Sequence, residues 1–215
     1  LASTHGWREV EIEPVDEPLV RVADIGPRVV DDPRYHAMGL PGALTEGWVR
    51  EGVAARLAAA AAALPDGRTL VVWDGYRPIE TQAALYNAYL DELSMVHTDW
   101  PASALEEAAA RYVTPPSRSV FSPPPHLTGG AVDLTLGDGD GRPLDLGTDF
   151  DAFTPLSHHA RTDVPAPAQR NRLLLLGVMT AAGWDFYRNE WWHYQLFDAR
   201  RFPLIADADL PQGMM

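Results

Sequence analysis

Apolar residues in the first half of the chain recur at spacings that predict three helices and one strand. Between residues 45 and 64 they return every three or four positions, which predicts a helix that ends at Pro65. Residues 69–73 form a short β-branched and apolar run, as in a buried strand. Two more helices are predicted, over 79–93 and 101–113, each beginning next to a proline.

The second half combines alternating and helical patterns. Residues 130–136 alternate as a strand does, and the glycine-rich stretch 137–141 predicts a hairpin turn. A strongly apolar helix is predicted over 169–182. Two aromatic-rich runs, 184–187 and 191–197, are expected to form a closing antiparallel pair.

These patterns predict one α+β domain over residues 1–215, with a small antiparallel sheet flanked by helices. Residues 1–44 mix proline and aspartate with short apolar runs, and we expect an irregular N-terminal wrap of loops and short edge strands. Residues 45–215 are the predicted core. No internal repeat and no linker divides the chain.

The composition restricts which partners and which metal ligands the chain can use. The chain has 215 residues and a formal net charge of -13, so nucleic acid is not an expected partner, because phosphate binding needs a basic surface. No stretch approaches the roughly 20 apolar residues of a membrane span. Cysteine is absent, so a tightly bound metal would have to use histidine, aspartate or glutamate.

The strongest local signal joins His126 to Asp133 through Leu-Thr-Gly-Gly-Ala-Val. Imidazole and carboxylate suit zinc, and catalytic zinc sites usually have three protein ligands. Gly129 and Gly130 allow a tight bend between the two residues. Asp133 stands in an otherwise apolar strand, where a carboxylate needs a cation or hydrogen bonds. The alternative is an ordinary loop histidine and a capping aspartate.

A second signal is Glu190-Trp-Trp-His193. In a regular strand Glu190 and His193 would face opposite sides, so a turn or bulge must lie between them if both are to reach one metal. Paired tryptophans beside them suit the apolar wall of a small-ligand site. The alternative is a core aromatic cluster in which His193 only donates a hydrogen bond.

The third signal is Arg77, which follows the end of a predicted strand. A guanidinium there could stabilise the negative charge that develops on a carbonyl oxygen during attack. A salt bridge from Arg77 to Asp74 is the alternative interpretation.

Taken together and in order, the motifs resemble the D-alanyl-D-alanine dipeptidases of the VanX type. That zinc peptidase family also holds D,D-carboxypeptidases and, more distantly, the Hedgehog zinc domain. The matching segments are residues 73–78, 126–136, 147–151, 157–159 and 190–193.

The resemblance implies one zinc ion per chain and a small dipeptide as substrate. Under it, His126, Asp133 and His193 are the three zinc ligands. Glu190 is the general base that activates the attacking water and later protonates the leaving amine, and Arg77 stabilises the oxyanion. Retention of Glu190 and Arg77 favours an enzyme over a zinc-binding interaction domain without turnover.

Asp151 resembles the acid that receives the free amino terminus of the substrate, although Asp145 and Asp149 lie close by. This match favours a dipeptidase over a D,D-carboxypeptidase or endopeptidase that acts on cell-wall peptides. One departure concerns the same end of the substrate. The family commonly has a serine where this chain has Pro124, and the nearest serine is Ser122.

We expect a cytoplasmic protein, because the implied substrate is small and no targeting signal is visible; export followed by removal of a signal peptide is the alternative. No pattern in the sequence sets the oligomeric state.

Overall fold

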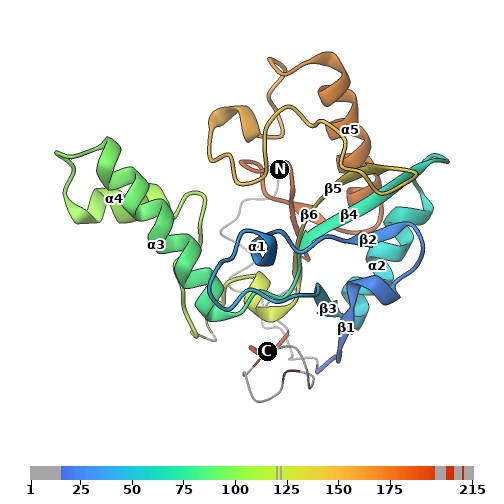
Figure 1. Ribbon diagram of the computed structural model, residues 1–215, viewed down its shortest axis with the longest axis horizontal. Coiled ribbons are helices and arrows are strands. Elements are labelled where there is room, and N and C mark those ends of the chain that lie inside the picture. The colour runs from blue at the N-terminus through green and yellow to red at the C-terminus, as the bar shows by residue number, and fades with distance from the viewer. Residues whose placement is uncertain (1–15, 120, 122, 197–201, 206–209, 211–215) are drawn as a thin grey trace.

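The computed structural model describes residues 16–119, 121, 123–196, 202–205 and 210 (Figure 1). Its helices and strands, in chain order, are β1 (Leu19–Arg21), η2 (Val22–Asp24), β2 (Val29–Asp31), α1 (Arg34–Ala37), β3 (Trp48–Arg50), α2 (Glu51–Ala62), β4 (Arg68–Asp74), α3 (Ile79–Val96), α4 (Ala102–Ala109), η3 (His126–Thr128), β5 (Ala131–Asp138), η4 (Pro155–Ser157), α5 (Ala166–Ala181), β6 (Asp185–Phe186) and β7 (His193–Gln195).

A five-stranded sheet in the order β2-β4-β5-β7-β6 forms the centre of the molecule. All its neighbours are antiparallel except β2 and β4, which run parallel. β1 and β3 form a separate two-stranded sheet. The predicted α+β class with a small sheet is therefore confirmed, and the sheet is antiparallel as expected except at the β2–β4 pair. The early strands β1 and β2 are as short as expected.

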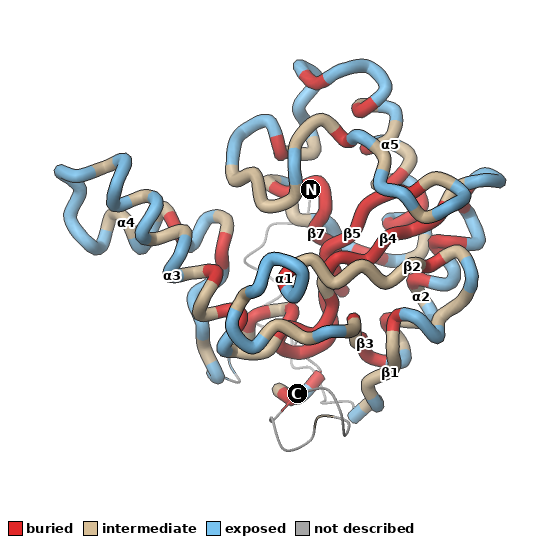
Figure 2. Tube along the Cα trace, in the orientation of Figure 1, coloured by how far each residue is buried: buried red, intermediate tan, exposed pale blue. Residues whose placement is uncertain are grey.

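The sheet separates an apolar side from a polar side. On β5, Val132, Leu134 and Leu136 join the core with residues of α2 and α5. Asp133 lies between two of them and points the other way, because successive side chains of a strand alternate. Figure 2 shows the buried part of the chain concentrated on β4, β5 and β7.

A bulge in β4 positions the polar side. The register between β4 and β5 shifts between Val72 and Asp74, so that Asp74 stands opposite Asp133. On the other edge of β5, Asp133 pairs with His193 of β7. Bulges often re-aim a side chain beside a functional site. Three polar residues thus lie side by side across three strands.

Helices α3 and α4 pack against each other and project from the sheet as an arm (Figure 1). Figure 2 shows exposed and partly buried residues alternating along this arm, with few buried ones. The predicted third helix is shorter than expected: α4 ends at Ala109 rather than 113. Within the described residues, none of the helices combines the length and apolar character that crossing a membrane requires.

The helix predicted from residue 45 begins six residues later, at Glu51. Trp48–Arg50 is instead strand β3, which pairs with β1. The buried Arg50 side chain donates to the carbonyl oxygens of Thr128 and Pro203, at 3.0 and 2.8 Å. These tertiary contacts hold the segment extended although its apolar spacing is helical.

Candidate metal centre and its cleft

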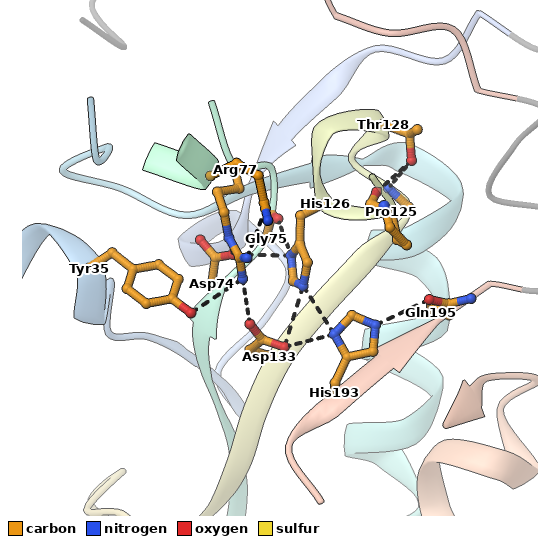
Figure 3. Close-up of polar contacts among 12 residues, drawn as sticks. Tyr35, Asp74, Gly75, Arg77, Pro125, His126, Thr128, Asp133, His193 and Gln195 are labelled. Atoms are coloured by element: carbon orange, nitrogen blue, oxygen red, sulfur yellow. Dashed lines mark hydrogen bonds and ion pairs between the residues drawn. The ribbon is translucent and has the colours of Figure 1, made fainter. Parts of the chain in front are cut away.

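The structure brings together the three side chains singled out as metal ligands (Figure 3). His126 comes from η3, Asp133 from β5 and His193 from β7. Nε2 of His126 lies 3.1 Å from Nδ1 of His193 and 3.4 Å from Oδ1 of Asp133. Nδ1 of His193 lies 3.0 Å from the same oxygen. Residues 67 positions apart in the chain therefore share one small site.

The bend after His126 depends on Gly129. This residue ends η3 with φ of 71°, a left-handed conformation that favours glycine. Its amide donates to the carbonyl of His126 at 3.0 Å. The turn leads directly into β5, so the carboxylate of Asp133 returns to the imidazole of His126. Gly130 does not adopt a positive φ.

The hydrogen bonds behind the rings determine which nitrogens face the centre. Nδ1 of His126 lies 2.9 Å from the carbonyl of Gly75 and 3.0 Å from Oδ2 of Asp74, so it carries the proton. Nε2 of His193 lies 3.2 Å from Oε1 of Gln195 and donates to it. In these tautomers the other nitrogen of each ring presents a lone pair.

Two imidazole lone pairs and one carboxylate oxygen thus converge with separations of 3.0 to 3.4 Å. Ligands at about 2.0 Å from a tetrahedral ion are ~3.3 Å apart, which is the spacing that zinc requires. Lone pairs this close repel one another unless a proton or a metal cation lies between them. The donor set and its spacing therefore fit a zinc ion.

The charge around His126 also favours a cation at this point. Burial and the nearby Arg77 would lower the pKa of His126, but Asp133 and Asp74 outweigh them and raise it to about 9. Burial alone would raise the pKa of Asp133, and its contacts with His126 and His193 hold it well below the usual range. The carboxylates that favour a proton here would equally attract a metal ion.

Arg77 is engaged in a network of its own (Figure 3). Its Nε donates to Oδ2 of Asp74 at 2.9 Å and its Nη1 to Gln82 at 3.0 Å. Nη2 donates to Oδ2 of Asp133 at 2.8 Å and to the hydroxyl of Tyr35 at 3.3 Å. The salt bridge to Asp74, weighed as the alternative for Arg77, is therefore present. The guanidinium also lines the cleft beside the three ligands.

A cleft of about 420 Å³ opens onto the three ligands, a size typical of small-ligand sites. Glu190 lines it from the turn that precedes β7, where its amide donates to the carbonyl of Tyr187 at 3.1 Å. This turn ends at Glu190; the required break between Glu190 and His193 is a bend at Trp191 and Trp192, after which β7 begins. Glu190 is buried, and its Oε1 has no hydrogen-bond partner among the described residues. Burial first, and then the charges of Asp133 and Asp151, raise its pKa well above the usual value.

Asp151 lines the same cleft from a loop. Its φ of 57° is unusual for a residue other than glycine, and such strain is often found at functional sites. Its Oδ2 atom is buried and without a hydrogen-bond partner among the described residues. Burial and the charge of Asp133 raise the pKa of Asp151 to about 7, against the opposing effects of Arg77 and Tyr35.

Sequence reasoning missed several residues of the cleft. Tyr35 comes from α1, in a segment where no motif was found, and only the fold places it beside Arg77. Gln195 could have been found, because it stands two residues after His193 and so shares its face of β7. Pro124 lines the cleft as well, whereas Ser122 lies outside the described residues.

The fold is similar to that of a solved structure with little sequence identity. A solved structure of VanYB in complex with D-alanine-D-alanine superposes with a TM-score of 0.51 over 89% of this chain and 87% of that one, at 16% identity, so the likeness concerns the fold.

The family follows from the sequence comparisons. The family model described as D-Ala-D-Ala dipeptidase, peptidase M15, matches residues 45–210, and the chain belongs to this family. It is 39% identical over 141 residues to a D-alanyl-D-alanine dipeptidase of Escherichia coli K12. It is 31% identical over 137 residues to one of Enterococcus faecium. These matches cover 66% and 63% of this chain, and 62% and 66% of the respective relatives.

Proposed function

We propose that the chain is a zinc-dependent dipeptidase that hydrolyses D-Ala-D-Ala or a closely related small dipeptide. The observation that carries the proposal is the convergence of His126 Nε2, His193 Nδ1 and Asp133 Oδ1 within 3.4 Å of one another, beside a buried glutamate in one cleft. The family membership and the naming of its relatives support the choice of substrate.

The three converging side chains would hold the zinc ion. When bound, the ion would supply a Lewis acid for the scissile carbonyl and make water ionisable near neutral pH. Three protein ligands leave a position open for water or substrate, as catalytic zinc sites do.

Glu190 is proposed as the general base. Glu190 lines a cleft that also reaches the three ligands, and its Oε1 has no hydrogen-bond partner among the described residues, so the carboxylate is available to take a proton from the attacking water. Its raised pKa makes it a stronger base than an exposed glutamate and lets it pass the proton on to the leaving amine.

Arg77 and Asp151 are proposed to handle the charges of the substrate. The guanidinium of Arg77 has five N–H donors, and the four bonds described above use four of them. The fifth and the positive charge would serve the developing oxyanion. The unpartnered oxygen of Asp151 would accept a bond from the free ammonium group, which selects for a dipeptide.

The experiment combines metal analysis with a panel of dipeptides. We expect about one zinc per chain and hydrolysis of D-Ala-D-Ala, with little or no cleavage of L-Ala-L-Ala or of N-acetyl-D-Ala-D-Ala. Purified protein that takes up no zinc after supplementation would contradict the proposed zinc-dependent hydrolysis. Equal cleavage of free and N-acetylated substrates would instead indicate a carboxypeptidase.

A further inference from the structure

Gln195 lies behind His193, one of the three ligands of the zinc site proposed above, on which its role rests. His193 and Gln195 are the first and last residues of β7, and both line the cleft. Two residues apart on a strand, they point to the same face. Gln195 pairs with Ala131 of β5 on one side and with Asp185 of β6 on the other, so its backbone is held by two neighbouring strands.

The two histidines of the site are supported differently. Behind His126, Nδ1 has two acceptors, the backbone carbonyl of Gly75 and the carboxylate of Asp74. The carbonyl cannot turn away, so the tautomer of His126 does not depend on a single side chain. Behind His193, the acceptor found among the described residues is Oε1 of Gln195, at 3.2 Å.

An amide side chain has two different ends, and only one suits this position. With Oε1 toward the ring, Nε2 of His193 is protonated and Nδ1 presents its lone pair to the centre. With the amide nitrogen toward the ring, Nε2 would have to accept and Nδ1 would carry the proton. A ring protonated at Nδ1 cannot bind a metal through that nitrogen.

We propose that Gln195 is a positioning residue that fixes His193 in the tautomer able to bind zinc through Nδ1. The amide does so without adding charge. Three carboxylates, of Asp133, Asp151 and Glu190, already line the cleft. A neutral acceptor therefore orients the ring without adding a further anion near the general base. Partners of this kind typically change metal affinity by about 10- to 100-fold when removed.

Zinc affinity, measured by competition with a chelator on the full-length chain, tests the proposal. Gln195→Leu removes the acceptor, and we expect its zinc affinity to fall by about 10- to 100-fold. Gln195→Glu places a carboxylate at this position, and both of its oxygens are acceptors whichever way the group turns. We expect its zinc affinity to equal that of the wild type or to exceed it. At saturating zinc, the dipeptidase rate of Gln195→Leu should recover toward that of the wild type.

Two controls separate positioning from a general effect on folding. Gln169→Leu removes an amide that donates to the backbone carbonyls of Thr162 and Val164, away from the cleft, and zinc affinity should not change. Gln195→Met has no acceptor but keeps an unbranched chain of similar length, and it replaces the leucine variant if that protein does not fold.

The outcomes distinguish this proposal from the proposed function. Wild-type protein that binds no zinc contradicts both. If wild-type protein binds zinc and cleaves D-Ala-D-Ala, but the leucine and methionine variants bind zinc equally well, the role of Gln195 is wrong and the function stands. The role is also wrong if the glutamate variant loses as much affinity as the leucine variant, because an acceptor would then not be what matters.

Discussion

Arg77 and Asp133 are joined through one carboxylate oxygen. Nη2 of Arg77 donates to Oδ2 of Asp133 at 2.8 Å, and both side chains are buried. The other oxygen, Oδ1, is thereby left facing His126 and His193. Arg77 thus orients the carboxylate so that one oxygen can bind a metal, in addition to any contact with substrate.

This relationship predicts two losses from Arg77→Lys. A single ammonium cannot reproduce the planar fork that reaches Asp74, Gln82 and Asp133 together. We expect zinc affinity to fall by about tenfold or more and kcat/KM by roughly 10²-fold or more, even at saturating zinc. Chelator competition and steady-state kinetics measure the two effects. Arg142→Lys, at an exposed position, is the matched control. If Arg77→Lys loses activity but keeps the wild-type zinc affinity, Arg77 acts on the substrate and does not orient Asp133.

Glu190→Gln should separate chemistry from metal binding. The amide keeps the size of the side chain but cannot take a proton from water. We expect kcat to fall by about 10²- to 10⁴-fold while the zinc content stays at the wild-type level. Metal analysis and initial rates on the same preparation provide the measurement. A variant that still turns over at the wild-type rate would show that another group is the base.

Asp151→Asn should weaken recognition of the free amino terminus. The substitution removes the negative charge of the carboxylate, whose Oδ2 has no hydrogen-bond partner among the described residues, and keeps the shape of the side chain. We expect KM for D-Ala-D-Ala to rise by about tenfold or more, the cost of about one charge-assisted hydrogen bond. Selectivity against the N-acetylated dipeptide should fall in parallel. Unchanged selectivity would point to Asp145 or Asp149 as the partner of the amine.

His159 predicts an acid-sensitive contribution to stability. Its ring centroid lies 4.8 Å from that of Phe186 and 5.8 Å from that of Tyr194, and neither ring nitrogen has a hydrogen-bond partner among the described residues. Burial, with a smaller effect of Arg172, lowers its pKa from 6.5 to about 4.

The folded and unfolded states differ in the pH at which His159 is protonated. Below pH 6.5 the unfolded chain takes up a proton on His159 that the folded protein does not accept until about pH 4, so acid favours unfolding. At pH 4.5 this lowers the free energy of unfolding by about 2.5 kcal/mol. His159→Phe should remove that part of the loss. Urea unfolding of both proteins at pH 7 and 4.5 measures it, and parallel losses in both would contradict the assignment.

Gly75 is predicted to admit no side chain. A Cβ there would lie 2.4 Å from the carbonyl oxygen of Trp48, a backbone atom, and its own carbonyl supports His126. We expect Gly75→Ala to destabilise the fold by about 1–3 kcal/mol and to weaken zinc binding. Thermal unfolding and chelator competition test this. Gly177→Ala in α5 is the control, because a Cβ there meets nothing within 4 Å and should stabilise the helix.

The long elements could be predicted from the sequence because their patterns agree with their surroundings. β4, β5 and α5 have strong apolar patterns, and each was found with boundaries close to those observed. The start of α2 could not be found, because Arg50 is held by carbonyl oxygens of residues far away in the chain. Local spacing contains no information about such contacts.

In the candidate site, too, local motifs could be predicted from the sequence and contacts between distant segments could not. His126, Asp133, Glu190 and His193 were recognised from short motifs, and the fold does bring them to one cleft. The pairing of Asp74 with His126 depends on a bulge in β4, which no spacing in the sequence indicates.

The three proposed ligands belong to three separate parts of the chain: the short 3-10 helix η3, the central strand β5 and strand β7 near the C-terminal end of the described residues. An ion bound to all of them would act as a reversible cross-link that only the folded chain can form. Such a link stabilises folding by an amount that grows with the logarithm of free metal over its dissociation constant. Depletion of the metal would then make the chain more sensitive to proteolysis in addition to abolishing its activity. The supply of the ion would therefore set the lifetime of each molecule before degradation.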